Sequence, residues 1–261
     1  MSENQDTEEL KAMLAELKTL ADSGDAEAQA VLAECYFKGW GFEKNIAAGT
    51  EYFEKAEAQN FDFDETVYTF VAQNYCALKR YEPAARLFEK SIELGDADAY
   101  FGLGKLYLLG LGVGQNPAKA FDCFKNAYDF GFKTPELLCL LGEAYLDGTG
   151  TPKNPRLAIQ FFERASSDSY LEADYQLAYI YYNGILGETD YARATRYFEK
   201  IQHIACDKDE KISAALNECR QKTLSKKSKQ KQHPPAKNEN PVPAEAVPAS
   251  EEVSVPAEAV P

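Results

Sequence analysis

The sequence has few of the residues on which catalytic and metal sites depend. Its 261 residues include two histidines, His203 and His233, and six cysteines that form no C-x-x-C pair. It contains no G-x-S-x-G, H-E-x-x-H or G-x-x-x-x-G-K-[ST] motif, and its one S-x-x-K match, Ser228 to Lys231, lies in a lysine-rich stretch. We therefore assign no catalytic residue, no metal ligand and no cofactor.

Long apolar runs and an excess of positive charge are also missing. No run approaches the roughly 18 apolar residues of a transmembrane helix, and the opening MSENQDTEEL has neither region of a secretory signal. With 42 acidic and 28 basic residues the net charge is −14, which disfavours nucleic acid and anionic membranes as partners. We expect a cytoplasmic protein with reduced cysteines.

Aromatic residues are missing from the carboxyl-terminal segment. Residues 221–261 hold seven of the twelve prolines and no aromatic residue, and such a composition buries too little apolar surface to offset the entropy of ordering. We expect a disordered tail over residues 223–261, in which a lysine-rich stretch precedes two copies of VPAEAVP. The duplicated heptapeptide is either a docking motif or a linker.

The rest of the sequence contains five copies of one pattern. GLGVGQNPAKAFDCFKNA begins at Gly110, and related stretches begin at Gly39, Gly148 and Gly184, each after an apolar segment that ends in Tyr-x-x-Gly. A further copy, VAQNYCALKRYEPAARLFEK, has a shorter loop between its two segments. Small and aromatic residues recur at helical spacing in both segments. Each copy is therefore predicted to be a helical hairpin.

The residues between the two segments support this prediction. Asn116-Pro117 and Asn154-Pro155 combine an N-cap acceptor with proline at the first helical position. The glycine that follows each first segment suits a helix end with positive φ. GLGVGQNPAKA is thus interpreted as a hairpin turn and not as a phosphate-binding loop, which in nucleotide-binding proteins follows a strand.

The full pattern is A-x-A-x-x-x-L-G-x-x-Y-x-x-G-x-G-x-x-x-N/D-x-x-x-A-x-x-x-F-x-x-A. It resembles the Sel-one-like repeat, a relative of the tetratricopeptide repeat with a longer hairpin loop. The resemblance implies an all-α fold, a right-handed α/α solenoid of five hairpin repeats with capping helices and a disordered tail. The predicted units are an N-terminal capping helix in 1–24, five repeats in 25–205 (25–60, 61–95, 96–131, 132–168 and 169–205), and a C-terminal capping helix in 206–222.

Repeats of this kind usually bind other proteins, and the first helix of each hairpin lines the concave side of the solenoid. We therefore expect an adaptor or scaffold that binds a protein or peptide partner of basic character on an acidic concave face. The candidate partner-binding residues vary between the copies on the first helices: Glu34, Phe70, Gln73, Lys105, Leu109, Leu140, Glu143, Asp147, Tyr179 and Asn183. A structural interpretation stays open, in which these charges are a solvated helix face and the apolar residues support adjacent hairpins.

Two alternatives from other classes stay open as well. The resemblance implies a possible hydrolase, because a penicillin-related activity has been proposed for cysteine-rich relatives, although those carry a cysteine pair in each repeat and this chain does not. Cys123 and Cys139 lie on consecutive segments and either approach each other or stay apart. The third alternative is a structural protein that self-associates through the ends of the solenoid. The sequence does not fix the oligomeric state.

Overall fold

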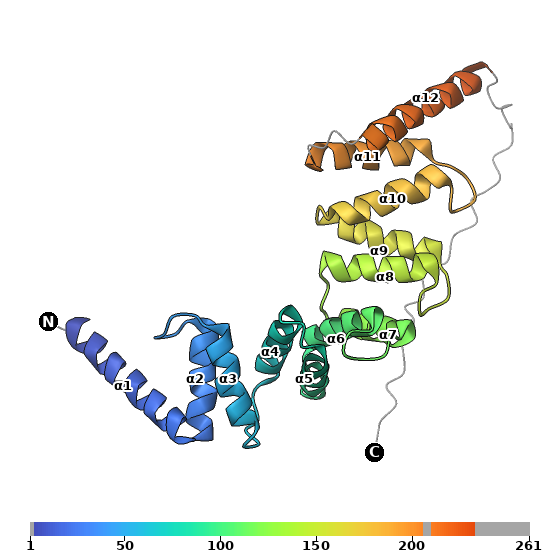
Figure 1. Cartoon of the computed structure of the whole chain (residues 1–261). Helices are drawn as coiled ribbons and strands as arrows, with labels where there is room; N and C mark the ends of the chain where they lie inside the picture. Colours follow the sequence, from blue (N-terminus) through green and yellow to red (C-terminus); the bar gives the residue numbers. More distant parts are fainter. Residues whose placement is uncertain (1–2, 206–209, 233–261) are drawn as a thin grey trace, which may run out of the picture.

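The computed structural model describes residues 3–205 and 210–232, which form α-helices and no strands. The helices are α1 (Glu3–Ser23), α2 (Ala26–Lys38), α3 (Ile46–Glu57), α4 (Glu65–Ala77), α5 (Tyr81–Glu93), α6 (Ala97–Leu109), α7 (Pro117–Asp129), α8 (Pro135–Asp147), α9 (Pro155–Ser167), α10 (Leu171–Asn183), α11 (Tyr191–Ala205) and α12 (Glu210–Gln232). Figure 1 shows them stacked in chain order along a curved path. The pairs α2/α3, α4/α5, α6/α7, α8/α9 and α10/α11 are antiparallel hairpins, so the predicted solenoid of five repeats is confirmed.

The hairpin turns use the predicted chemistry. The side chains of Asn116 and Asn154 accept hydrogen bonds from the backbone N–H groups three residues on, at the starts of α7 and α9. Gly110 ends α6 in the left-handed conformation, with φ of 68°. At Gly112 a Cβ atom would lie 2.4 Å from the backbone carbon of Tyr81. The glycine-rich stretch is therefore a turn that packs tightly on the preceding hairpin.

In the α6/α7 and α8/α9 hairpins the two helices approach closely where a glycine meets an aromatic ring. A Cβ atom added to Gly104 would lie 2.6 Å from the ring of Phe124, and one added to Gly142 would lie 2.7 Å from the ring of Phe162. Both rings are buried. Because a methyl group at either glycine would clash with a ring, these pairs fix the spacing of the helices.

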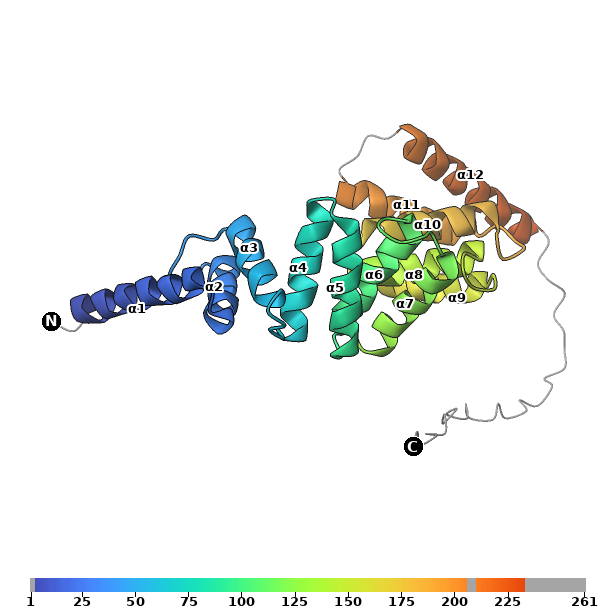
Figure 2. The ribbon, with the colours of Figure 1, turned by 60° about the horizontal axis from the view of Figure 1, so that its bottom comes forward.

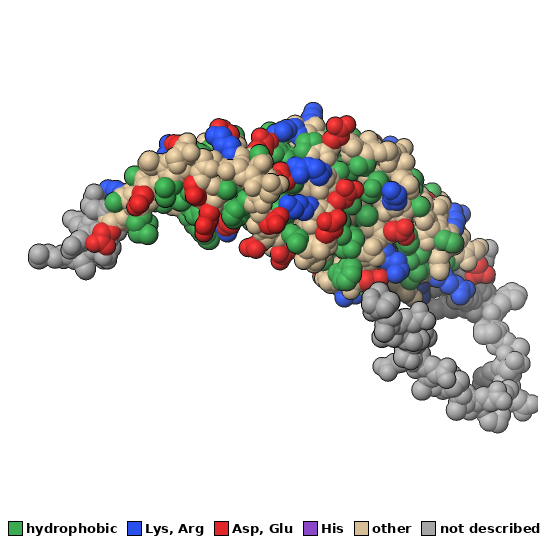
Figure 3. Space-filling view, turned by 90° about the horizontal axis from the view of Figure 1, so that it is seen from below, with side chains coloured by type: hydrophobic (Ala, Val, Ile, Leu, Met, Phe, Trp, Pro, Cys, Tyr) green, Lys and Arg blue, Asp and Glu red, His purple; other side chains and the backbone are tan. Residues whose placement is uncertain are grey.

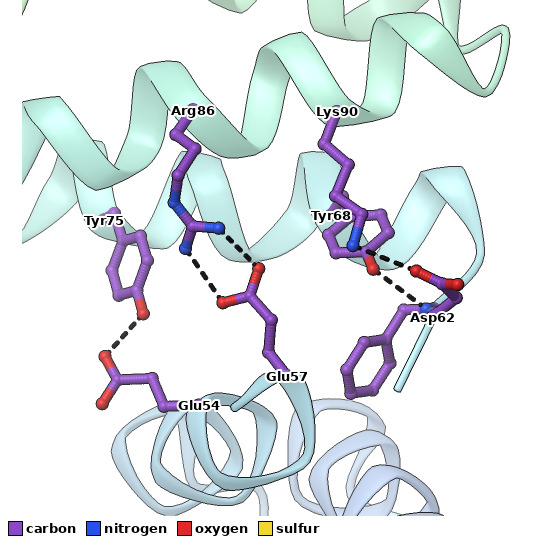
Figure 4. A network of polar contacts seen from close by, with 8 residues as sticks. Glu54, Glu57, Asp62, Tyr68, Tyr75, Arg86 and Lys90 are labelled. Atoms are coloured by element: carbon purple, nitrogen blue, oxygen red, sulfur yellow. Dashed lines mark hydrogen bonds and ion pairs between the residues drawn. The ribbon is translucent and has the colours of Figure 1, made fainter. Parts of the chain in front are cut away.

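Polar contacts join the first hairpin to the second, as Figure 4 shows. The carboxylate of Glu57 on α3 accepts two hydrogen bonds, of 2.8 and 2.9 Å, from the guanidinium of Arg86 on α5. Tyr75 on α4 donates a hydrogen bond of 2.6 Å to Glu54 on α3. These contacts connect residues of different repeats, so they hold the joint between hairpins in addition to the apolar core.

The N-terminal end of the solenoid is only partly covered. Leu14 of α1 contacts the loop at Gly41, and Leu17 packs against the core of the first hairpins. Leu10 and Leu20, which share the helix face expected to cap the first hairpin, are instead 52% and 47% exposed. The N-terminal cap therefore leaves an apolar face of α1 open.

The C-terminal end is covered by α12, whose Ile212, Leu216 and Cys219 are buried against α11. This helix runs to Gln232, which corrects the expected start of the disordered tail at residue 223. Lysine and glutamine are good helix formers, so the helix continues past the point where packing ends. The expectation for the rest of the tail, including both VPAEAVP copies, concerns residues 233–261, which lie outside the described residues, as does Cys206.

Candidate functional site

All ten candidate partner-binding residues are at least partly exposed, and they lie on the first helices of the five hairpins. Leu109 on α6 and Tyr179 on α10 are 60% and 57% exposed, which is high for large apolar side chains. Figure 3 shows an arched molecule on whose visible face acidic, basic and hydrophobic side chains are interspersed. We call these ten residues the candidate stripe.

Three hollows lie at successive joints between first helices. The α2–α4 hollow, of about 210 Å³, is lined by Glu34, Phe37, Lys38, Thr66, Val67 and Phe70. The α4–α6 hollow, of about 300 Å³, is lined by Gln73, Cys76, Tyr81, Phe88, Phe101, Gly102, Lys105, Leu106, Leu109 and Leu111. The α6–α8 hollow, of about 130 Å³, is lined by Leu108, Pro117, Ala120, Phe121, Phe124, Leu140, Glu143, Ala144, Asp147 and Thr149. The structure thus brings all of the candidate stripe to these hollows except Tyr179 and Asn183.

The α4–α6 hollow is large enough for one apolar side chain. Aromatic residues line it, and Leu109 stands exposed among them. Gly102 lies against the ring of Phe88 so closely that a Cβ atom would clash with it. The equivalent residues of the other first helices, such as Val31 and Leu140, carry larger side chains. Gly102 is a sequence signal for this hollow, but the candidate stripe includes neither Gly102 nor Phe88, because Phe88 matches a core position of the repeat.

The two lysines on the first helices of the five hairpins are both engaged in ion pairs. Lys38 lies 2.6 Å from the carboxylate of Glu34 on the same helix. Lys105 on α6 lies 2.8 Å from the carboxylate of Glu136 on α8, so this pair crosses the joint between two hairpins. Each lysine therefore already has a negative partner.

Negative charge without such compensation lies on α8 and α10. Among the described residues, no ion pair engages Glu143, Asp147 or Glu172. Burial raises the pKa of the Glu143 carboxyl above its ordinary value, and repulsion from Glu172 and Asp147 raises it further. A cationic group placed beside Glu143 would therefore be bound favourably.

The apolar members of the candidate stripe differ in their surroundings. Phe70 is half-buried, and its ring centroid lies 5.0 Å from that of Phe37, so it packs between the first two hairpins as well as lining a hollow. Tyr179 is exposed, and its backbone carbonyl accepts a hydrogen bond from the Asn183 side chain. Phe70 therefore supports adjacent hairpins, as the structural interpretation expected, whereas the side chains of Leu109 and Tyr179 are exposed.

The cysteines form no disulfide in the part of the chain that the structure describes. Cys123 on α7 packs against Gly104, whereas Cys139 on α8 is buried in the core that continues to α12. Burial raises the pKa of the Cys139 thiol to about 12.

Within residues 3–205 and 210–232, no group of three or more histidine, cysteine or acidic side chains could hold a metal ion. None of the described helices combines the length and the apolar character needed to cross a membrane.

Comparison with solved structures shows likenesses in fold. The protective antigen c5321 of uropathogenic Escherichia coli, described as displaying an SLR fold, is 24% identical with a TM-score of 0.58 over 73% of this chain. The match spans only 40% of that protein's length. A Sel1 repeat protein from Oxalobacter formigenes is 23% identical with a TM-score of 0.57, over 76% of this chain and 82% of that one. At these identities the likeness shows the fold alone, and no curated protein matches the chain.

The sequence itself matches a family model. The model described as Sel1 repeat matches residues 26–61, 80–96, 97–129, 135–170 and 171–201, which together make up more than half of the chain. Most of the unmatched part of the second hairpin is α4, which precedes the shortened loop. The resemblance of the sequence pattern to the Sel-one-like repeat is thereby confirmed, and the chain belongs to the Sel1 repeat family.

Proposed function

We propose that this protein is an adaptor or scaffold that binds a segment of a partner protein along the candidate stripe. Sel1 repeat proteins generally act as protein-interaction scaffolds. The observation that carries the proposal here is the succession of three hollows along the first helices, lined by Phe70, Leu109, Leu140 and other candidate residues. Exposed apolar side chains beside a hollow are typical of the few residues that supply most of the energy of an interface.

The lining of the hollows favours a particular partner chemistry. The α4–α6 hollow suits a large apolar side chain, and the unpaired carboxylates on α8 and α10 suit lysine or arginine. Packed helices lie about 8–10 Å apart and an extended chain rises about 3.3 Å per residue. A segment that crosses from one first helix to the next would therefore carry its apolar and basic residues about three positions apart.

The same charges weigh against other partners. Phosphate groups would be repelled by Glu143, Asp147 and Glu172, so neither nucleic acid nor an anionic membrane fits this surface. The proposal includes a cytoplasmic location, which the free thiols of the described cysteines favour. It includes no catalytic step. Turnover of β-lactams or peptidoglycan fragments by the purified chain would contradict it and support the hydrolase alternative.

A matched pair of leucines allows a direct test. Peptides are selected from a random library on the full chain, and their affinities are measured for Leu109→Glu and Leu78→Glu. Both leucines are 60% exposed, but Leu78 follows α4 and lines none of the three hollows. We expect Leu109→Glu to weaken binding at least about tenfold and Leu78→Glu to leave it unchanged. Equal affinities of both variants would contradict the placement of the site.

A further inference from the structure

Helix α1 is built as the second helix of a hairpin, and among the described residues no first helix precedes it. It ends as α5 does: the glycine after each helix has φ of 103°, and the following aspartate closes the same turn. The Asp25 N–H donates to the Leu20 carbonyl over 3.2 Å, as the Asp96 N–H donates to the Ser91 carbonyl over 3.1 Å. Position 20 of α1 therefore corresponds to position 91 of α5.

This correspondence identifies the open face of α1. In α5, which packs against α4 of the same hairpin, Ala84 and Ser91 are completely buried, and Ser91 donates a hydrogen bond to a backbone carbonyl of α4. Their counterparts in α1 are Met13 and Leu20, which are 67% and 47% exposed. Thus α1 exposes the face that a first helix covers in a complete hairpin.

The other end of the described structure, at α12, has the complementary arrangement. Helix α12 packs on α11 in the way that α6 packs on α5 and α10 packs on α9, which makes it a first helix. Among the described residues no second helix follows it. Its uncovered side carries Asn217, Arg220 and Leu224, of which Leu224 is 66% exposed.

The two half-hairpins have opposite charge and cannot meet within one molecule. The sequence of α1 has six carboxylates and two lysines, and that of α12 has seven lysines or arginines and two glutamates. Figures 1 and 2 both show the two helices at opposite ends of the solenoid. A contact between them therefore requires a second copy of the chain.

We propose that α12 of one copy packs against α1 of the next, so that the two helices complete a hairpin between molecules. Hairpin helices are antiparallel, which places the start of α1 beside the end of α12. Leu10 and Met13 then pack against Leu224, and Glu9 and Glu16 face a basic helix. Such a contact is heterologous, so assembly proceeds head to tail and leaves the candidate stripe free.

Light scattering over a range of protein concentrations tests this proposal. The mass-average mass rises above the 29.1 kDa of one chain as the concentration increases, and it falls back when salt screens the charges. The double variant Met13→Ser/Leu20→Ser remains monomeric. Val31→Ser, which removes a 45% exposed side chain from α2, associates like the wild type. A wild-type chain that stays monomeric at every concentration would overturn the proposal.

Cysteine trapping identifies which helices meet. Leu10→Cys and Leu224→Cys chains are oxidised separately and as a mixture, with the wild type as the control for the native thiols. A disulfide-linked dimer that forms in the mixture and in neither single variant supports the α12 to α1 contact. A dimer of Leu10→Cys alone shows that two α1 helices pair instead, and it overturns the proposal even if the protein self-associates.

Discussion

Lys200 on α11 lies 3.0 Å from a carboxylate oxygen of Asp174, and the side chain of Asp174 is completely buried. The lysine also donates to the backbone carbonyl of Ser166 over 2.6 Å, and the Ser166 hydroxyl donates to the same aspartate oxygen. One cation thus joins α9, α10 and α11 at the C-terminal end of the solenoid. Because the Asp174 carboxylate is shielded from water, its negative charge is compensated mainly by the ammonium group of Lys200.

Replacing Lys200 by alanine should therefore be costly. It leaves an uncompensated buried carboxylate, and we expect a loss of about 3 kcal/mol in the free energy of unfolding, measured by urea denaturation. Lys125→Ala serves as the control, because Lys125 pairs with Asp129 one turn away on the exposed side of α7. That pair contributes about 0.5 kcal/mol or less. Equal losses in the two variants would show that Asp174 does not depend on its lysine.

Replacing Glu143 by glutamine should stabilise the fold in a pH-dependent way. Its pKa is raised in the folded chain by burial and by Glu172 and Asp147, so the folded state holds the proton more tightly than the unfolded state does. The stability from that proton is complete below the unfolded pKa of about 4.3 and is lost as pH rises through the folded pKa. Glu143→Gln should therefore raise the melting temperature at pH 7, and the gain should vanish below pH of about 4. The exposed Glu89→Gln on α5 should show no such gain.

Removing the N-cap of α7 should lower the free energy of unfolding by a predictable amount. Asn116 accepts a hydrogen bond of 3.0 Å from the Lys119 N–H at the start of α7. Asn116→Ala should lower the free energy of unfolding by about 1 kcal/mol, because the N–H groups at the helix start lose their acceptor. Asp122→Ala, on the exposed side of the same helix, should change it by less than about 0.5 kcal/mol. A loss confined to Asp122→Ala would contradict this account of the turn.

The Cys139 thiol should be protected from alkylation. Burial raises its pKa to about 12, so almost none of it is the reactive thiolate at pH 8. Mass spectrometry of iodoacetamide-treated protein should show little modification of the Cys139 peptide in the native state and complete modification in guanidinium chloride. Rapid native modification would mean that the α8 to α12 core opens readily.

Local features of the fold were predictable from the sequence because they depend on neighbouring residues. Asn116 caps its helix and Gly110 ends the preceding one through contacts within a few positions of the chain. Recurrence in several copies then identified the hairpins and the family. The open face of α1 was not predicted, because Leu10 and Leu20 match a capping helix in spacing, and only the position of α2 shows that they are uncovered.

The candidate site was predictable in part for the same reason. The variable positions on the first helices are exposed, and most of them line the hollows, because helical spacing alone fixes which side of a helix they share. The ion pair between Lys105 and Glu136 joins different repeats, as does the hydrogen bond from Lys200 to the backbone carbonyl of Ser166. The relative placement of the repeats is set by packing between hairpins, which the spacing of residues along one helix does not report.

A double-mutant cycle between the protein and a bound peptide tests the central claim most directly. A peptide selected on the full chain is measured with its large apolar residue intact or changed to alanine, against wild-type protein and Leu109→Ser. If that residue enters the α4–α6 hollow, the two changes are coupled, and the loss in the double variant is smaller than the sum of the single losses by about 1 kcal/mol or more. Additive losses, with no coupling between Leu109 and any apolar peptide residue, would contradict binding at this surface.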